Sequence, residues 1–174
     1  MLPPISFENG VYQKEGKSLF LTSGEFHYFR VPKSAWRARL SLLKEAGILC
    51  AATYIPWLLH EPEEGVFDFD SAPYLQLEEF LKLCGEMGIY VICRPGPYQY
   101  SELCYNGLPA WLVRKYPQIL ATDISGRPLT RGSVSYLHPL FLEKTRAWFD
   151  QVCPLIAKYT LKNGGSVLYV QVDN

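Results

Sequence analysis

Hydrophobic residues along the chain fall into two patterns that follow one another in turn. Four largely apolar runs are short enough to be strands, and they occupy residues 19–22, 48–57, 89–93 and 166–172. Between them, apolar side chains recur at helical spacing in three segments, around residues 36–46, 75–84 and 140–161. Gly47 and Gly88 follow the first two segments, as glycines behind helix C-termini do. The pattern therefore predicts the order β-α-β-α-β-α-β.

Three other segments complete this outline. Residues 5–18 predict a short antiparallel ribbon with its turn at residues 14–17. Residues 110–115 predict a short helix, and residues 117–135 predict an irregular stretch rich in turns. Pro154 lies inside the last long helical segment, where a proline bends a helix. The chain is thus expected to begin with a ribbon and to make its longest excursion between the third and fourth strands.

Long connections join the predicted core strands, and each can hold a helix, which requires parallel strands and right-handed crossovers. Polar residues gather where the strands end, among them Glu25, His60, Arg94 and Asn174. An open doubly wound sheet concentrates its site at one switch point, whereas a (β/α)8 barrel uses every strand end. We therefore expect an α/β fold, a partial (β/α)8 TIM barrel with about four parallel strands and three helices behind a short β-ribbon.

The length of the chain limits how much of a barrel it can form. A complete barrel needs about 250 residues, whereas this sequence has 174. We expect residues 1–174 to be the N-terminal half of a (β/α)8 catalytic domain, truncated after strand four. Its hydrophobic content of 48% is enough for one sizeable core. A half barrel leaves open strand edges, so this fragment alone is expected to self-associate.

Charge and composition exclude several classes of partner. The net charge is 0, from 17 basic and 17 acidic residues, and no run of Lys and Arg exceeds two residues. Nucleic acid is therefore not an expected partner. No stretch of about 18 uncharged apolar residues occurs, so no membrane span is expected. The five cysteines are odd in number and lie mostly in apolar segments, and no signal peptide is visible, which predicts a cytoplasmic protein with reduced thiols.

The segment after the third strand carries the sharpest local signal. Residues 95–97, Pro-Gly-Pro, stiffen the backbone just past a buried strand and place Arg94, Tyr98 and Glu102 near the strand end. Either these side chains belong to a binding site, or the loop is rigid and its arginine and carboxylate form a structural pair. We favour the binding site, because charged groups beside a buried strand end are typical of one.

His60 and Glu61 follow the second strand and raise the question of a metal. A helical zinc-protease motif needs a second His four residues after the first, but Glu64 occupies that position and Pro62 intervenes. With three His and no Cys pair at ligand spacing, no metal is expected. The pair forms either a hydrogen-bonding wall for a polyhydroxylated ligand or part of a capped loop, and both interpretations stay open here.

Aromatic residues also lie on or just after the strand ends, namely Tyr54, Trp57, Tyr98 and Tyr100. Aromatic faces stack on the apolar face of a sugar ring, and tyrosine hydroxyls add directional hydrogen bonds. Trp57 is expected in the core. For Tyr54 and Tyr98, packing and sugar binding are equally good interpretations.

Five motifs in order resemble those of glycoside hydrolase family 35, the retaining β-galactosidases. They are SGEFHYFRVP at 23–32, TYIPW at 53–57 with HEP at 60–62, RPGPY at 94–98, GLPAWL at 107–112 and VQVDN at 170–174. The resemblance covers almost the whole chain, and five motifs at suitable spacing are far more specific than any one of them.

The resemblance implies an enzyme that removes terminal β-linked galactose from a β-galactoside by double displacement, without metal or organic cofactor. Tyr54, Glu102 and Asn174 match family residues that hold the sugar, and the backbone near Tyr100 and Ser101 would line the same pocket. The supporting residues are expected to be His60, Glu61, Arg94 and Tyr98.

The sequence also departs from the family pattern. Leu58 stands where the family has Asn, residues 99–102 (Gln-Tyr-Ser-Glu) replace Ile-Cys-Ala-Glu, residues 106–107 (Asn-Gly) replace Gly-Gly, and Asp173 replaces Glu. Tyr100 is much larger than cysteine. The sugar specificity at that wall is therefore left open.

The resemblance places the catalytic carboxylates outside residues 1–174. A Glu directly after Asn174 is expected to be the general acid/base, with the nucleophile on a later strand, so the fragment alone is expected to be inactive. Glu25, Glu61 and Glu102 are interpreted as hydroxyl acceptors or arginine partners. Two alternatives remain, namely a non-catalytic sugar-binding remnant and a retaining barrel hydrolase for another β-glycoside.

Overall fold

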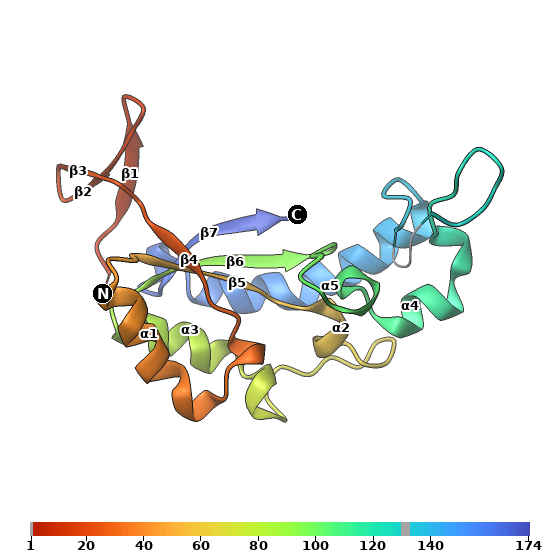
Figure 1. The fold of residues 1–174 in the computed structure, drawn as a ribbon, viewed down its shortest axis with the longest axis horizontal. Helices are drawn as coiled ribbons and strands as arrows, with labels where there is room; N and C mark the ends of the chain where they lie inside the picture. Colours follow the sequence, from red (N-terminus) through yellow and green to blue (C-terminus); the bar gives the residue numbers. More distant parts are fainter. Residues whose placement is uncertain (1, 130–132) are drawn as a thin grey trace. The chain divides into compact units, whose positions relative to one another are not determined.

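The computed structural model describes residues 2–129 and 133–174. Its first sheet is an antiparallel ribbon with the order β1-β2-β3, formed by β1 (Ile5–Glu8), β2 (Val11–Lys14) and β3 (Lys17–Leu19) (Figure 1). Each of its two turns contains a glycine in the left-handed region, Gly10 with φ +81° and Gly16 with φ +73°. The expected ribbon is present, with one strand more than its single predicted turn implies.

This third ribbon strand corrects the prediction of a core strand at residues 19–22. Leu19 pairs with Tyr12 in the ribbon, and Phe20 is 87% exposed. The first strand of the parallel sheet is instead β4 (Ser23–Glu25), in which Glu25 pairs with Ala52. The prediction failed because a local hairpin uses the same apolar residues that a core strand would use.

The second sheet contains four parallel strands in the order β4-β5-β6-β7. The other three strands are β5 (Cys50–Tyr54), β6 (Tyr90–Gly96) and β7 (Val167–Val172). Every residue of β5 is buried, as expected for a parallel strand covered on both faces. Sequential strands are neighbours, so the sheet has the β-α-β succession of a partial (β/α)8 barrel.

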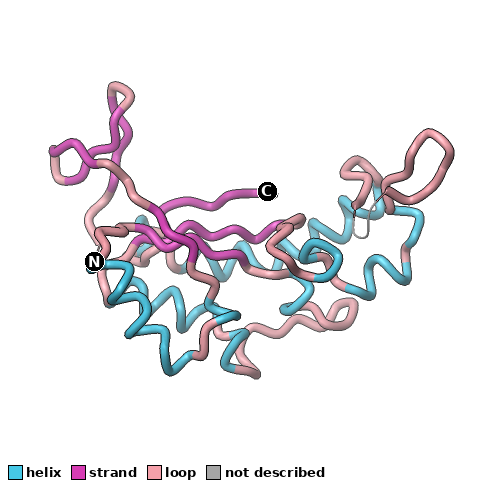
Figure 2. Tube along the Cα trace, in the orientation of Figure 1, coloured by secondary structure: helices cyan, strands magenta, loops and turns pink. Residues whose placement is uncertain are grey.

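Helices connect the strands where the apolar periodicity predicted them (Figure 2). The three long helices are α1 (Trp36–Glu45), α3 (Leu77–Glu86) and α5 (Pro139–Lys158), and two short ones are α2 (Trp57–His60) and α4 (Ala110–Lys115). Gly47 (φ +80°) and Gly88 (φ +71°) follow α1 and α3 in the left-handed conformation of a helix C-terminus. Pro154 lies inside α5, which begins one residue earlier and ends three residues earlier than predicted.

Single-turn 3-10 helices occupy Tyr28–Arg30, Lys33–Ala35, Pro73–Leu75, Pro117–Ile119 and Leu161–Asn163. Residues Cys104–Gly107 form a turn in which Tyr105 (φ +51°) and Asn106 (φ +54°) are left-handed. The predicted irregular stretch 117–135 is otherwise built of turns and isolated bridges, and its residues 130–132 lie outside the described part of the chain.

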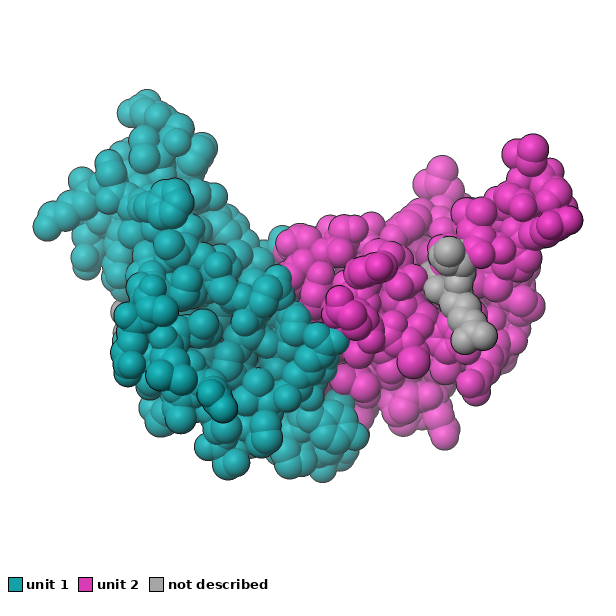
Figure 3. Space-filling view, viewed as in Figure 1, with its two compact units in different colours: residues 1–53, 70–93, 155–170 teal, residues 54–69, 94–154, 171–174 magenta. Residues whose placement is uncertain are grey.

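The chain divides into two compact units (Figure 3). The first contains Met1–Thr53, Asp70–Cys93 and Leu155–Val170. Its core is aromatic: the ring of Phe80 lies 5.5 Å from that of Tyr28 and 5.6 Å from that of Trp36, centroid to centroid. In Figure 1, α1 and α3 lie side by side in this unit.

The second unit contains Tyr54–Phe69, Arg94–Pro154 and Gln171–Asn174, so it holds the ends of three strands. Its core is built on three tryptophans. Trp57 stacks on Trp148 at 6.0 Å and meets Trp111 edge-on at 6.3 Å. Trp57 is completely buried, which confirms its expected place in the core.

Some cysteines and some apolar side chains of β7 lie at the surface. Cys50, Cys84 and Cys93 are buried free thiols, whereas Cys104 and Cys153 are exposed. On β7, Tyr169, Val170 and Val172 are at least 39% exposed. Within residues 2–129 and 133–174, no helix combines the length and apolar character needed to cross a bilayer.

Candidate functional site

Three neighbouring strands bring one side chain each to a common point in the second unit. Tyr54 is the last residue of β5, Arg94 lies near the end of β6, and Asn174 follows β7. Asn174 Oδ1 accepts hydrogen bonds from the Tyr54 hydroxyl at 2.8 Å and from Arg94 Nη2 at 2.6 Å. We call these three residues the strand-end cluster.

Arg94 is the centre of this cluster. It is 9% exposed, it also donates to the Tyr54 hydroxyl, and its Cζ lies 3.8 Å from the centroid of the Tyr54 ring. A buried guanidinium gains both from charge-assisted hydrogen bonds and from stacking on an aromatic face. The predicted supporting role of Arg94 therefore has a concrete geometry, in which it holds Tyr54 and Asn174 together.

The partners of Asn174 determine which way its amide faces. A guanidinium carries only donors, so the atom that faces Arg94 must be the amide oxygen. The Nδ2 group consequently points away from the cluster as a hydrogen-bond donor. At this position, the site presents a donor held in place by two other strands.

Asp173, directly before Asn174, has its own partners. Its backbone, with φ +63°, is left-handed, and its N–H donates to Gly96 O at 2.8 Å. The Tyr136 hydroxyl lies 3.3 Å from Asp173 Oδ1. Burial, and secondly the negative charge of Asp173, raise the pKa of Tyr136 well above its usual value, so this hydroxyl stays protonated and donates. The sequence offered no signal for Tyr136, which lies in a turn-rich stretch without a motif.

The other expected sugar-binding residues lie on the loop after β6. Tyr100, Ser101 and Glu102 all have left-handed backbone angles, with φ +54°, +38° and +53°. A cavity of about 400 Å³ is lined by Tyr100, Glu102, Leu103, Cys104 and Asn106. Tyr100 is 59% exposed, Glu102 is exposed, and Ser101 is buried. The structure thus brings Tyr100 and Glu102 to one cavity, which we call the loop cavity.

Tyr98 lies at the base of the same loop. Its ring centroid is 6.4 Å from that of Tyr100, with the planes tilted by 35°. It also lies close enough to Tyr136 to interact with it electrostatically. Tyr98 therefore connects the aromatic residue of the loop cavity with the tyrosine that contacts the end of β7.

His60 and Glu61 close the loop that follows β5. His60 is completely buried, and its Nδ1 lies 2.7 Å from Asp68 O. Burial lowers the pKa of His60 to about 4, so the ring is neutral at physiological pH. The Glu61 carboxylate accepts from Trp57 Nε1 and from the Gly65 N–H, and burial raises the pKa of Glu61. These are the contacts that the capped-loop interpretation requires.

A surface ion cluster holds the same loop from outside. The Glu64 carboxylate forms ion pairs with Lys115 of α4 and, at 3.0 Å, with Lys144 of α5. It also accepts a hydrogen bond from the Tyr116 hydroxyl at 2.9 Å. The hydrogen bond from Lys115, followed by those from Lys144 and Tyr116, lowers the pKa of Glu64 to about 2. Glu64, which stands where a zinc motif needs its second His, therefore anchors the loop.

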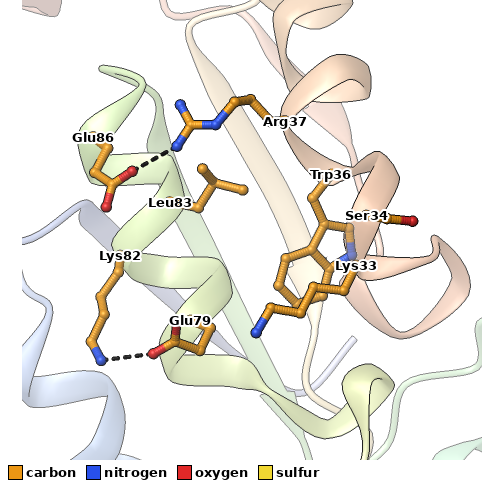
Figure 4. Close-up of a pocket in the computed structure, with 8 residues that line it drawn as sticks. All are labelled: Lys33, Ser34, Trp36, Arg37, Glu79, Lys82, Leu83 and Glu86. Atoms are coloured by element: carbon orange, nitrogen blue, oxygen red, sulfur yellow. Dashed lines mark hydrogen bonds and ion pairs between the residues drawn. The ribbon is translucent and has the colours of Figure 1, made fainter.

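A larger groove of about 460 Å³ lies elsewhere, between α1 and α3 in the first unit (Figure 4). Two ion pairs lie along it, Arg37 with Glu86 and Lys82 with Glu79, each at 2.8 Å. The groove joins helix surfaces and carries no strand-end residue, so it is not the candidate site. Across the described ranges 2–129 and 133–174, no group of three or more His, Cys, Asp and Glu residues could hold a metal ion.

Comparison with known proteins places the chain in one family. The model of glycosyl hydrolases family 35 matches residues 12–174. A protein named exo-beta-D-glucosaminidase from Thermococcus kodakarensis is 40% identical over 98% of this chain, and a beta-galactosidase from Felis catus is 36% identical over 98%. A protein named beta-1,2-glucosyltransferase from Ignavibacterium album is 42% identical over 94%.

The chain spans 22 to 23% of the length of these three relatives. Among solved structures, the beta-galactosidase of the Antarctic haloarchaeon Halorubrum lacusprofundi shares the fold, with a TM-score of 0.70 and 22% identity. That match covers 88% of this chain and 21% of the solved one.

Proposed function

The chain belongs to glycosyl hydrolases family 35, and we propose that the protein containing it hydrolyses terminal β-linked galactose from glycosides with retention of configuration. The observation that carries the proposal is the strand-end cluster, because it presents a fixed amide donor at the ends of adjacent parallel strands. We also propose that residues 1–174 form the N-terminal half of the (β/α)8 catalytic domain, with β-galactosides as partners.

The Asn174 amide supports a hydroxylated sugar. Its Nδ2 group can donate to a hydroxyl oxygen, whereas an ammonium group has no lone pair to accept that bond. A contact of this kind with the 2-hydroxyl strengthens in the oxocarbenium-like transition state of a glycosidase. Glu102 adds an acceptor whose charge strengthens a bond from a sugar hydroxyl. The amide thus favours galactose over a 2-amino sugar.

A second candidate is hydrolysis of β-linked glucosamine. Two observations favour it: relatives carrying the name exo-beta-D-glucosaminidase are 40% and 38% identical to this chain, and the carboxylates of Asp173 and Glu102 could pair with an ammonium group. The two candidate sugars differ at carbon 2, where glucosamine has an amino group in place of the hydroxyl, and in the configuration of the hydroxyl at carbon 4. The Asn174 amide would distinguish them at carbon 2.

The chemistry requires two carboxyl groups about 5 to 5.5 Å apart, one acting as acid and base and the other as nucleophile. We propose that a Glu following Asn174 in the whole protein is the acid/base and that the nucleophile lies on a later strand. The side chains of residues 1–174 then bind and orient the sugar. Tyr54, Glu102 and Asn174 would contact it, and Arg94 would hold two of them.

The test compares aryl β-galactoside and aryl β-glucosaminide as substrates of the whole protein. We expect the galactoside to have the higher kcat/KM, with the β-anomer as the first product by NMR. Asn174→Asp should shift the preference toward the glucosaminide, because a carboxylate binds an ammonium group and no longer donates to a hydroxyl. Asn9→Asp, in the exposed turn between β1 and β2, is the matched control. A wild-type preference for the glucosaminide would establish the second candidate instead.

A further inference from the structure

Gln99 is a completely buried polar side chain that connects two strand ends. Its Nε2 group donates to Ile55 O at 2.7 Å and to Arg94 O at 3.1 Å. Ile55 directly follows Tyr54, so these two carbonyls belong to the backbone that carries two members of the strand-end cluster. Nε2 is therefore the atom through which the loop after β6 is joined to that cluster.

The backbone of Gln99 closes the other side of the loop. Its N–H donates to Asn106 O at 3.0 Å. Residues 99 and 106 are thus the two ends of a short segment that carries Tyr100, Ser101 and Glu102. Gln99 thus fastens the loop at its base, because its side chain contacts the strands and its backbone contacts the returning chain.

Two glycines leave the space that the Gln99 side chain occupies. Both are left-handed, Gly96 with φ +81° and Gly107 with φ +86°. A Cβ on Gly107 would lie 3.2 Å from Gln99 Cβ and Oε1, and one on Gly96 would lie 3.3 Å from Gln99 Cγ and Nε2. The loop is shaped around this side chain.

The segment that Gln99 fastens has an unfavourable backbone. Left-handed angles at Tyr100, Ser101 and Glu102 crowd each Cβ against the following carbonyl, so such a run persists only when its surroundings hold it. Gln99 Oε1 is buried and makes no hydrogen bond to the described residues. The holding function of the side chain therefore lies in Nε2 alone.

We propose that Gln99 is a positioning residue, which sets Tyr100 and Glu102 of the loop cavity in place relative to Tyr54 and Arg94. It does so through hydrogen bonds to the two strand ends and does not contact the sugar itself. The proposal rests on the proposed function, because it assigns the sugar-binding role to the groups that Gln99 positions.

The first test uses Gln99→Met in the whole protein, with Gln151→Met on the surface of α5 as the control. Methionine keeps the volume and removes both side-chain hydrogen bonds. Because a displaced Glu102 weakens sugar binding more than chemistry, we expect KM for an aryl β-galactoside to rise about tenfold with a smaller change in kcat. An unchanged KM in the folded variant, or an equal effect of Gln151→Met, overturns the proposal.

A second variant, Gln99→Glu, adds a pH dependence that general loss of packing would not produce. An ionised carboxylate would face two carbonyl oxygens, whereas a protonated one can donate to one of them. Burial raises the pKa of such a carboxyl, so KM should recover as pH is lowered from 7 toward 5. Wild-type KM serves as the reference at each pH. A variant whose KM follows the wild-type profile contradicts the proposal.

A third measurement follows the conformation of the loop independently of catalysis. Cys104 lines the loop cavity and is exposed, and Cys153, also exposed, lies on α5 and serves as the internal reference. In Gln99→Met, alkylation of Cys104 relative to Cys153, measured by peptide mass spectrometry, should change several-fold. If the whole protein hydrolyses no β-glycoside but this ratio changes, the proposed function fails and the fastening role of Gln99 stands. An unchanged ratio overturns that role.

Discussion

The strand-end cluster and the loop cavity are held in opposite ways. In the cluster, Tyr54, Arg94 and Asn174 come from three strands and bond directly to one another. In the loop cavity, Tyr100 and Glu102 stand on a left-handed backbone that is fastened at its base by Gln99. The side chains of the first region thus hold one another, whereas the second is held by a residue outside the cavity.

Four of the six departures from the family pattern lie in the loop, at residues 99–101 and 106. The other two, Leu58 and Asp173, lie just after β5 and β7, whereas Tyr54, Arg94 and Asn174 match the motifs that the chain resembles. A surface loop tolerates changes of sequence that the ends of buried strands do not. Because most departures lie in the loop, we expect the loop to influence which sugar the site accepts more than the strand-end cluster does.

Arg94→Met gives the most severe test of the cluster. The variant loses the hydrogen bonds that Arg94 donates to Tyr54 and Asn174. It also loses the contact between the guanidinium cation and the Tyr54 ring. We expect kcat/KM of the whole protein to fall about 100- to 1000-fold and the free energy of unfolding to fall by about 2 to 4 kcal/mol.

Steady-state kinetics and urea unfolding measure both effects, and Arg37→Met is the control. Arg37 belongs to an exposed ion pair with Glu86, for which a loss of at most about 1 kcal/mol is expected. Should Arg94→Met prove as mild as the control, Arg94 would not hold the cluster together.

Glu102→Gln tests the loop cavity. If Glu102 binds a sugar hydroxyl as proposed, loss of its charge weakens that bond, whereas an exposed carboxylate contributes little to the fold. We expect kcat/KM to fall about 10- to 100-fold with an unchanged unfolding midpoint. Glu45→Gln at the exposed end of α1 controls for loss of one negative charge. Normal kinetics in a folded Glu102→Gln protein would remove Glu102 from the site and leave the cluster alone.

Gly107→Ala and Gly126→Ala form a matched pair that isolates the fastening of the loop. Both glycines are left-handed, with φ +86° and +79°, but an added Cβ meets Gln99 at Gly107 and nothing within 4 Å at Gly126. The shared backbone strain should cost about 1 kcal/mol in each protein, and the contact with Gln99 about 1 to 2 kcal/mol more in Gly107→Ala. Urea unfolding measures the difference, and equal losses would show that the loop is not shaped around Gln99.

Much of the fold could be predicted because it is encoded locally. Apolar periodicity located the three long helices and three of the four parallel strands. Residues 19–22 were assigned wrongly because a hairpin and a core strand share the same short apolar signal. Helix α4 matched its predicted bounds at Ala110–Lys115, since proline precedes it and a tyrosine with non-helical backbone ends it.

The site was less predictable, because its contacts join residues far apart in the chain. In the alternative to a binding site, the motif around residue 94 predicts a carboxylate as the partner of Arg94. In the structure, Arg94 instead donates to Tyr54 and Asn174. Tyr136 carries no signal in the sequence, and Gln99 stands out only as a departure from the family pattern. Nothing in the sequence tells which buried carbonyl or carboxylate will lie beside either side chain. Periodicity predicts elements, and only tertiary packing decides which polar atoms meet.

Tyr136→Phe has the smallest expected effect. It tests whether the residues after β7 are held in place by Tyr136 or by the strand-end cluster. The variant removes the hydroxyl that donates to Asp173 and keeps the ring, which meets Phe141 edge-on at 5.8 Å. Losing one long hydrogen bond at a partly exposed site should cost about 0.5 to 1 kcal/mol and lower kcat/KM about two- to fivefold.

The pKa of Tyr136 is raised in the folded protein, so the native state holds this proton more tightly than the unfolded state. The stabilisation is therefore fully present below the ordinary tyrosine value of about 10 and decreases as pH rises above it. Urea unfolding of wild type and Tyr136→Phe should differ by a constant amount from pH 7 to 9, and by less above pH 10. A loss of activity larger than that of Glu102→Gln would mean that Asp173 and Tyr136, and not the loop cavity, form the second half of the site.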